Sequence, residues 1–458
     1  MKSTRSFLFL LALLMSGLSP GSQRARADEL PKDTNTIESL TPEQARKLVE
    51  TWRSSVLNLS GLITLDADTA KALAGLKGGW LHLNGVTTLD ADTAQALAQF
   101  KGGLALDGLT KLDADTAQAL AEFKGGLALN GLTMLDADAA KALAKLKGYS
   151  LDLDGLTTLD KATAKALAGL KGQAIVLGLT SLDADTAKSL AEFAGKRLSL
   201  NRLPTLDADT AQALAEFRGQ GLYLSGLTTL DAATAKALAE FKGTNLALDG
   251  LPKLDADTAK AIAQSKVKML HLDGLKTLAA ATAKPLAEFT GNLLSLDGLT
   301  TLDVETATAL AEFRGRGLLL DGLTTLDADT YKAIAANPRW SGQLPNLNAL
   351  DADMAKALAA AQRWQGQLSG LKAFEGPDSV AVAQALATRE GPLALPNLEK
   401  ISPKTLTTLI EKRDVKIPLI EKLQLIPEPD GSPTEDFVIP EWLEERQKQQ
   451  RFKGPAAE

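Results

Sequence analysis

The sequence predicts an α/β solenoid, in which parallel strands line the concave face of an arc and short helices line its convex face. Three observations lead to this prediction: one unit recurs every 23 or 24 residues, its first half alternates in hydropathy, and its second half carries the signals of a short helix. The phrase Leu-Asp-Ala-Asp-Thr-Ala occurs six times without change, first at Leu65 and last at Leu254. With weaker copies from Leu40 to Ile401, the chain holds about sixteen units.

The first half of each unit predicts a short strand followed by a turn. In residues 104–107 the two leucines fall on one face, and Ala105 and Asp107 fall on the other. This alternation is the period of a half-buried strand. At Gly108 we expect a bend, after which Leu109 returns to the interior.

The second half of the same unit predicts a helix of about two to three turns. Asp113 is placed as the N-cap, where its carboxylate can accept the free amides of the first turn, and Asp115 adds negative charge that favours the helix dipole. Lys124 and Gly125 are expected to close the helix, Lys124 as a cation in the last turn and Gly125 as a residue that tolerates a positive φ. Phe123 is expected to cover the end of the helix.

A single unit is too small to fold, because a helix shorter than roughly 12 residues is marginal in water and a lone strand has no partner. Stacking supplies the missing contacts: strands pair at about 4.8 Å, and their leucines form one continuous core. Helices need about 8 to 10 Å between axes, so they must lie outside the strands, and the array must curve by roughly 20° per unit.

With its Leu-x-Leu strand, turn leucine and outer helix, the unit resembles a bacterial leucine-rich repeat over about residues 40–401. The family pattern is Leu-x-x-Leu-x-Leu-x-x-Asn-x-Leu. The resemblance implies a horseshoe whose concave face recognises a ligand. Leu109 stands where the family has an asparagine that bonds neighbouring loops, so the sequence does not predict an asparagine ladder at that position.

The N-terminus reads as an export signal. Lys2 and Arg5 supply positive charge, residues 6–18 are mostly apolar, and small residues precede an expected cleavage after Ala27. A membrane anchor is the alternative, but about 13 residues fall short of the roughly 20 that a spanning helix needs. The chain has no cysteine, and hence no disulfide or lipid-bearing N-terminal cysteine. We therefore expect a secreted or periplasmic protein with no membrane span in the mature chain.

The rest of the chain divides by how closely it follows the repeat. The expected segments are a signal peptide (1–27), an N-terminal capping segment (28–56), the leucine-rich-repeat solenoid (57–403), and a C-terminal cap with a charged tail (404–458). A helix opening at Pro42 is expected to shield the first strand, and a charged helix is expected at 441–453, as a cap or as a solvated tail. Trp340 and Trp364, each preceded by arginine, are expected to fill space where the usual glycine is lost; an aromatic and basic binding spot is the alternative.

Composition argues against two classes of function. Removal of residues 1–27 takes away four cations and no acid, which moves the formal net charge from −6 to −10, and aromatic residues are only 4% of the chain. Nucleic acid is therefore not an expected partner. An enzyme is not expected either, because the two histidines, His82 and His271, lie eight units apart, and the chain has no cysteine, phosphate loop or nucleophile elbow. No cofactor is assigned.

A row of acidic and amide residues follows one edge of the expected sheet: Asn84, Asp107, Asn130, Asp154, Asn201, Asp249, Asp273, Asp297 and Asp321. Such a row could collect calcium. However, calcium needs six to eight converging oxygens, and Asp-Gly is an ordinary turn former whose side chain bonds its own backbone. We favour the turn, and no metal site is assigned. The row beginning with Asp66, Asp90 and Asp113 is assigned to helix capping.

The expected contact surface is the set of outward strand positions, which vary while the core positions stay fixed. They are Asn58, His82, Ala105, Ala128, Asp152, Val176, Ser199, Tyr223, Ala247, His271, Ser295, Leu319 and Gln343. The candidate binding residues are His82, His271 and a basic and aromatic patch of Lys196, Arg197, Asn201, Arg202 and Tyr223; random drift of exposed positions is the alternative. The resemblance implies a secreted, non-catalytic scaffold that binds a protein or a glycan. A structural spacer of the cell envelope is the alternative function, and the partner and oligomeric state remain open.

Overall fold

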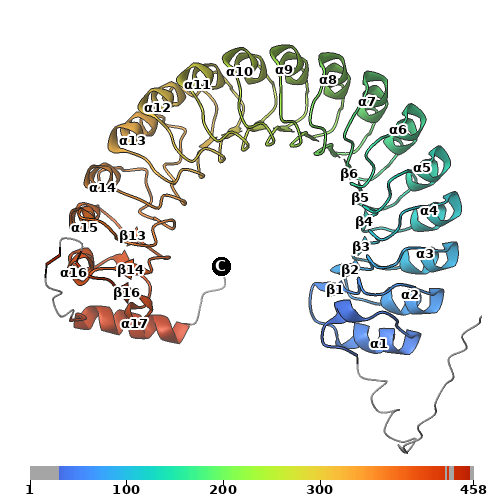
Figure 1. The fold of residues 1–458 in the computed structure, drawn as a ribbon, viewed down its shortest axis with the longest axis horizontal. Coiled ribbons are helices and arrows are strands. Elements are labelled where there is room, and N and C mark those ends of the chain that lie inside the picture. The colour runs from blue at the N-terminus through green and yellow to red at the C-terminus, as the bar shows by residue number, and fades with distance from the viewer. Residues whose placement is uncertain (1–29, 429–430, 433–437, 454–458) are drawn as a thin grey trace, which may run out of the picture.

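The computed structural model describes residues 30–428, 431–432 and 438–453, so the expected signal peptide lies outside the described residues. The chain forms an open horseshoe, with strands along the inner side and helices along the outer side (Figure 1). The predicted leucine-rich-repeat-like solenoid is therefore confirmed. The arc follows from the different widths of its two layers, because helices need more lateral space than paired strands.

The inner layer is a parallel sheet of 12 strands that follow one another in chain order. The strands are β1 Val56–Asn58, β2 Trp80–His82, β3 Gly103–Ala105, β4 Gly126–Ala128, β5 Ser150–Leu153, β6 Ala174–Leu177, β7 Arg197–Ser199, β8 Gly221–Tyr223, β9 Asn245–Ala247, β10 Met269–His271, β11 Leu293–Ser295 and β12 Leu318–Leu319. The core leucines of successive units pair in register, as Leu81 does with Leu104. The strand expected over residues 104–107 thus begins and ends earlier, at Gly103 and Ala105.

Short helices form the outer layer: α1 Pro42–Thr51, α2 Ala67–Leu73, α3 Ala91–Leu97, α4 Ala114–Leu120, α5 Ala137–Leu143, α6 Lys161–Ala168, α7 Ala184–Ala191, α8 Ala208–Ala215, α9 Ala232–Ala239, α10 Ala256–Ala263, α11 Ala280–Leu286, α12 Val304–Ala311, α13 Ala328–Ala335, α14 Ala352–Ala359, α15 Ser379–Ala387 and α16 Pro403–Ile410. The predicted N-caps are confirmed, because Asp113 accepts the Thr116 amide at 2.8 Å. Thr116 also donates its hydroxyl to the Leu89 carbonyl of the unit before, at 3.3 Å. The aspartate and threonine of the repeated phrase thus cap one helix and tie it to its neighbour.

The glycines also have a role that the sequence did not predict. Helix α4 already ends at Leu120, and Gly125 is not among the glycines with positive φ. Instead, a Cβ on Gly125 would lie 1.7 Å from the carbonyl oxygen of Gly102, and one on Gly108 would lie 2.3 Å from that of Asn84. These glycines let successive units approach closely. The turn expected at Gly108 is confirmed, because the Leu109 amide donates to the Leu106 carbonyl at 3.1 Å across it, but the helix-closing role of Gly125 was wrong.

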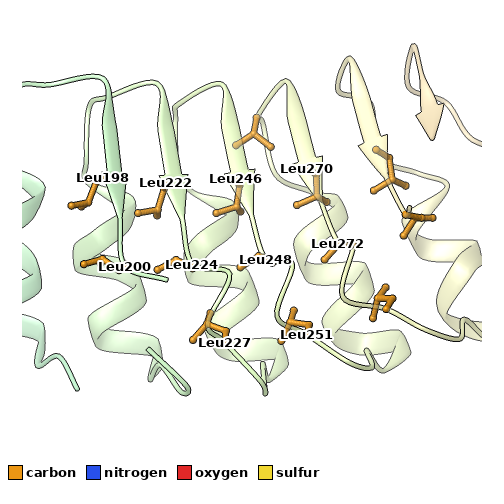
Figure 2. Packing of buried hydrophobic residues seen from close by; sticks show 14 of the residues in the cluster. Leu198, Leu200, Leu222, Leu224, Leu227, Leu246, Leu248, Leu251, Leu270 and Leu272 are labelled. Carbon is orange, nitrogen blue, oxygen red and sulfur yellow. The ribbon is translucent and has the colours of Figure 1, made fainter. Parts of the chain in front are cut away.

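The core is one unbroken column of side chains between the two layers. Figure 2 shows the leucines of neighbouring units stacked in rows, and Leu198, Leu222 and Leu246 have no exposed surface. A row of phenylalanines closes the helix side; the rings of Phe193 and Phe217 stack at 6.1 Å between centroids. Each unit thus buries its apolar face against copies of itself.

The N-terminal end is covered differently from the prediction. The first helix begins at Pro42 as expected, with a capping box between Thr41 and Gln44, but it packs beside α2 in the outer row. The edge of β1 is met instead by a short 3-10 helix, η1 Thr34–Thr36, whose Thr34 hydroxyl donates to the Asn58 carbonyl at 2.6 Å.

At the C-terminal end the continuous sheet is replaced by two short strand pairs: β13 Leu393–Ala394 with β15 Val415–Lys416, and β14 Lys400–Ile401 with β16 Gln424–Leu425. A 3-10 helix, η2 Ile420–Lys422, connects β15 to β16 along the chain. Trp340 and Trp364 are 3% and 1% exposed, so the space-filling interpretation is confirmed and the binding spot was wrong. The predicted charged helix is α17 Glu441–Lys453. It is a cap, because Leu443 is fully buried and Gln447 bonds the backbone of Pro418.

Candidate functional site on the concave face

In three-residue strands such as β2, the middle residue is buried in the core, and the first and third residues alternate with it on the side of the hollow. Two regions of this face carry large side chains. The first lies on β2, where Trp80 is 38% exposed and its indole meets the His82 ring edge-on at 6.0 Å between centroids. Sequence reasoning found His82 but missed Trp80. Alignment of the units on Leu81 would have found it, because the next two units have Gly103 and Gly126 at that position.

Trp80 lies flat across the neighbouring strands. A Cβ on Gly103 would be 2.5 Å from two atoms of the indole, and one on Gly126 would be 3.6 Å from its far edge. Gly103 therefore makes room for the ring, and Gly126 lies in van der Waals range of its far edge. A large aromatic held in one orientation loses little conformational entropy when a ligand contacts it.

The second region lies on β7 and β8. The Arg197 guanidinium carbon is 4.2 Å from the centroid of the Tyr223 ring, and the Tyr223 hydroxyl accepts from Asn245 Nδ2 at 3.3 Å. A Cβ on Gly221 would be 2.6 Å from the Tyr223 ring, so this ring also lies against a glycine. Lys196 is exposed in the turn before β7, and its backbone carbonyl accepts amides from the next unit.

Asn201 and Arg202, which the sequence analysis placed in the same patch, both bond residues of other repeat units. Asn201 Oδ1 accepts the Ser225 amide at 3.1 Å, and Arg202 forms an ion pair with Asp154 Oδ2 at 2.6 Å. The intervening unit is one residue short, since Leu177 is followed directly by Gly178 where the previous unit has Asp154. Arg202 thus reaches across the missing position while its side chain remains 53% exposed, and its role in ligand contact stays a prediction.

Between the two regions the inner face has a floor of small side chains: Gly103, Ala105, Gly126, Ala128, Ser150 and Ala174. Asp152 stands in this floor. Burial raises the pKa of its carboxyl above the ordinary value, and the nearby Arg197 charge opposes that rise.

The acidic and amide row forms a ladder between units. Seven of its nine side chains accept the backbone amide of the equivalent residue in the next unit at 2.8 to 3.2 Å, as Asn84 does from Asp107, Asp297 from Asp321, and Asn201 from Ser225. The prediction that these side chains bond their own backbone was wrong for these pairs. The row supplies the inter-unit bonds that the family assigns to asparagine, but from a position two residues earlier than Leu109.

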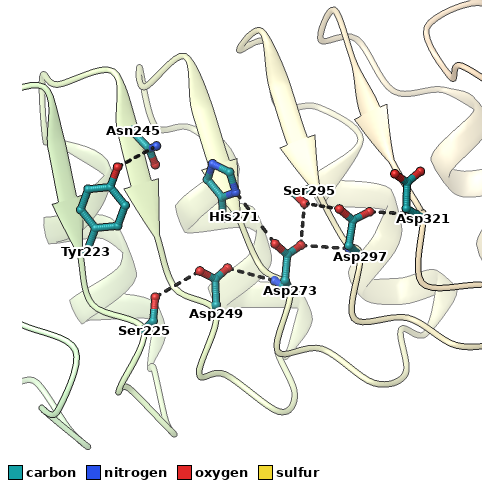
Figure 3. Close-up of polar contacts among 9 residues, drawn as sticks. All are labelled: Tyr223, Ser225, Asn245, Asp249, His271, Asp273, Ser295, Asp297 and Asp321. Atoms are coloured by element: carbon teal, nitrogen blue, oxygen red, sulfur yellow. Dashed lines mark hydrogen bonds and ion pairs between the residues drawn. The ribbon is translucent and has the colours of Figure 1, made fainter. Parts of the chain in front are cut away.

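His82 and His271 lie on β2 and β10 of one sheet, so they contribute to different surroundings, as expected. His271 Nδ1 is 3.9 Å from Asp273 Oδ2, and Asp249 belongs to the same cluster (Figure 3). The hydrogen bond to Asp273 raises the pKa of the His271 imidazole, against the effect of burial. Sequence reasoning named these residues separately; the 24-residue register that brings Asp249 beside Asp273 was the signal that could have joined them.

A surface groove lies away from this face, along α7 and α8, with Lys188, Glu192 and Phe217 in its lining. None of the candidate residues lines it. Among the described helices, none is both long and apolar enough to span a membrane.

Comparison with known proteins gives similarity in solved structures only. No family model and no curated protein matches the sequence. Similar solved structures are the TLR13–ssRNA13 complex (18% identity, TM-score 0.42, 78% of this chain and 55% of that one), the Toll–Spatzle complex of Drosophila (14%, 0.40, 76% and 54%) and the mouse RP105/MD-1 complex (16%, 0.40, 81% and 72%). The chain therefore spans about half the length of the first two, and its own strand pairing defines its fold.

Proposed function

We propose that this protein is a non-catalytic binding protein whose ligand lies along the concave face between β2 and β8. The observation that carries the proposal is the pair of anchors on this face, the exposed Trp80 at one end and the stacked Arg197 and Tyr223 at the other. Tryptophan, tyrosine and arginine are the residues that most often dominate the binding energy of protein interfaces. Of the two expected ligand classes, these anchors favour a protein over a glycan.

The anchors are also preorganised. Both aromatic rings lie against glycines that leave them room, and the guanidinium of Arg197 already covers one face of Tyr223. The small floor between them lets a ligand approach the sheet backbone closely. At about 4.8 Å per strand, the distance along the sheet from β2 to β8 is roughly 29 Å, which suits an extended segment or the edge of a domain.

The expected export signal indicates the compartment in which the protein would bind this ligand. We propose that the mature chain begins at Asp28 and works outside the cytoplasm. The ligand would then be a component of the envelope or of the surrounding medium.

Ligand capture with the mature chain as bait tests the proposal. We expect Trp80→Ala and Tyr223→Ala each to lower recovery of the captured protein at least tenfold, which corresponds to a loss of about 1.4 kcal/mol or more. Val304→Ala is the matched control, because Val304 is a 45% exposed apolar residue on α12 of the convex face. Equal recovery with all three variants would reject the concave face as the contact surface, and recovery of a glycan in place of a protein would change the ligand class.

The spacer alternative keeps some support from the near-identical units and the small floor residues. It expects no ligand on the concave face. A spacer should tolerate deletion of one unit, such as residues 231–254, with no effect beyond a shorter arc. A deletion variant that folds but loses a captured ligand would argue against it.

A further inference from the structure

Three residues with metal-binding side chains meet at the inner edge of β9 and β10. One ligand atom from each of Asp249, His271 and Asp273 lies within 4.8 Å of the others. The His271 and Asp273 side chains are 25% and 32% exposed, so an ion from solvent can reach them. Ligands about 2.0 to 2.2 Å from one ion lie roughly 3 to 4 Å apart, which small side-chain rotations would achieve here.

Both carboxylates are already held in place by neighbouring donors. Ser225 Oγ donates to Asp249 Oδ2 at 3.1 Å. Asp273 Oδ1 accepts from Ser295 Oγ at 2.6 Å and from the Asp297 amide at 2.9 Å, which leaves its Oδ2 facing His271. Fixed outer partners of this kind orient the ligands of metal sites.

Two buried polar atoms beside the cluster have no partner among the described residues, His271 Nε2 and Asn245 Oδ1. Figure 3 shows the His271 ring between Asn245 on one side and Asp273 on the other. An imidazole that binds a metal through Nδ1 carries its proton on Nε2 and donates it to a nearby acceptor. Asn245, which carries the other unpaired atom, lies on that side of the ring, although the two atoms do not bond each other in the metal-free chain.

The ladder itself does not need carboxylates at these positions. Asn84, Asn130 and Asn201 each accept the next backbone amide through a neutral side chain. Aspartates at 249 and 273 therefore add negative charge that the hydrogen bonds do not require.

We propose that Asp249, His271 and Asp273 form a binding site for a divalent transition-metal ion, with zinc as the best match. Imidazole and carboxylate ligands together suit zinc and its neighbours in the first transition series. Calcium is a poorer match, because its protein ligands are oxygen atoms. Water would complete the coordination on the open side of the site.

None of the three proposed ligands is an anchor of the ligand surface proposed above, although Asn245, which lies beside His271, donates to the Tyr223 hydroxyl at 3.3 Å. The histidine of the metal site lies on β10, beyond the β2 to β8 stretch, and neither Trp80 nor Arg197 belongs to this site. Metal binding can therefore succeed or fail whether or not the concave face captures a protein.

Calorimetric titration of the full-length, chelator-stripped protein with zinc chloride tests the site. We expect one zinc ion per chain, with calcium chloride giving at least tenfold weaker binding. His271→Ala should weaken zinc binding at least tenfold. The matched control is His82→Ala, which removes the other of the chain's two histidines and should leave zinc affinity unchanged.

A second pair of variants separates metal binding from folding. Asp273→Asn keeps an oxygen for the Asp297 amide, so it should retain the melting temperature of the stripped protein while zinc affinity falls at least tenfold. Asp107→Asn makes the same change in the ladder far from the site and should leave zinc affinity unchanged. Absence of zinc binding in the wild type, or equal losses in His82→Ala and His271→Ala, would overturn the proposal.

Discussion

Two stretches of the inter-unit ladder make the same hydrogen bonds with different charges. The N-terminal ladder, which we define as Asn84, Asp107, Asn130 and Asp154, alternates amides with carboxylates. The C-terminal ladder, which we define as Asp249, Asp273, Asp297 and Asp321, has a carboxylate in every unit. Acceptor distances are 2.9 to 3.1 Å in the first and 2.8 to 3.2 Å in the second. Neutral amides and carboxylates thus serve equally as acceptors in this ladder, and the hydrogen bonds do not depend on the charge.

The C-terminal ladder therefore carries a cost that folding alone does not explain. Its carboxylates stand on adjacent units, roughly 4.8 Å apart at the strand spacing. Burial, together with the charge of Asp297, raises the pKa of the Asp321 carboxyl, whereas at Asp273 burial is outweighed by hydrogen bonds from His271 and Ser295, which lower its pKa. Clustered carboxylates whose pKa values are shifted in this way are typical of sites that hold a cation or another ligand. The comparison thus separates a structural stretch from a candidate functional one within the same row.

The largest expected effect comes from removing an acceptor in the N-terminal ladder. Asn130→Ala leaves the amide of Asp154 without its side-chain partner, which should lower the free energy of unfolding by about 1 to 3 kcal/mol. Asn130→Asp keeps the acceptor and should lower it less. Because long repeat arrays unfold with reduced cooperativity, amide hydrogen exchange around Asp154 is the suitable measurement. Unchanged protection in Asn130→Ala would show that the ladder bonds do not stabilise the fold.

The next-largest effect tests whether the position of a carboxylate, or the net charge of the chain, decides whether that carboxylate stabilises the fold. Helix α11 lies in the C-terminal half and has Ala279 at its N-cap, with no side-chain bond to the first turn. In the previous helix, Asp255 accepts the Thr258 amide at 2.8 Å. Ala279→Asp should therefore stabilise α11 by about 1 kcal/mol, although it makes the chain more negative. Faster hydrogen exchange in α11 of this variant would contradict the capping argument; Ala279→Asn, which caps without charge, is the control.

The solenoid could be predicted from the sequence because its signals repeat. Alternating leucines, aspartate caps and a fixed period agree in nearly every unit, and the stacking that they imply is what the structure shows. The role of Gly125 could not be predicted in this way, because the close contact with Gly102 exists only between stacked units. For the same reason, the expectation that each aspartate of the row bonds its own backbone named the wrong hydrogen-bond partner. The side chain of Asp107 bonds Asn130, which is 23 residues away.

The candidate site was harder to predict, because it consists of departures from the repeat. Arg202 is one such departure, and its exposed position suggested ligand contact, yet it forms an ion pair with Asp154 across a shortened unit. Trp80 was overlooked because its position precedes the core leucine and is glycine in the next two units. Only the placement of neighbouring units showed that its ring rests on those glycines. Departures from a repeat therefore identify candidates, and inter-unit contacts decide which of them are structural.

The smallest expected effect concerns charge alone. Asp297→Asn keeps an oxygen for the Asp321 amide but removes the carboxylate between Asp273 and Asp321. At pH 7 and in the presence of chelator, the variant should be more stable than the wild type by a few tenths of a kcal/mol, since like charges on adjacent strands destabilise a sheet by roughly 0.2 to 1 kcal/mol. The same replacement at Asp107, whose ladder neighbours are neutral amides, should change stability less.

The dependence of stability on pH gives the sign of the charge effect at Asp297. The pKa values of Asp321 and His271 are both raised in the folded chain, and Asp297 contributes to both shifts. The folded state therefore binds these protons more tightly and gains stability as pH falls from 7 toward the unfolded values of about 6.5 and 3.9. Asp297→Asn should reduce that gain in thermal melts. Below about pH 4 both proteins should lose stability, because the bond to the Thr258 amide lowers the pKa of Asp255, and protonation of this cap removes its contribution. An equal gain from pH 7 to pH 5 in wild type and variant would show that the C-terminal ladder carries no repulsion, and the distinction between the two ladders would then rest on metal binding alone.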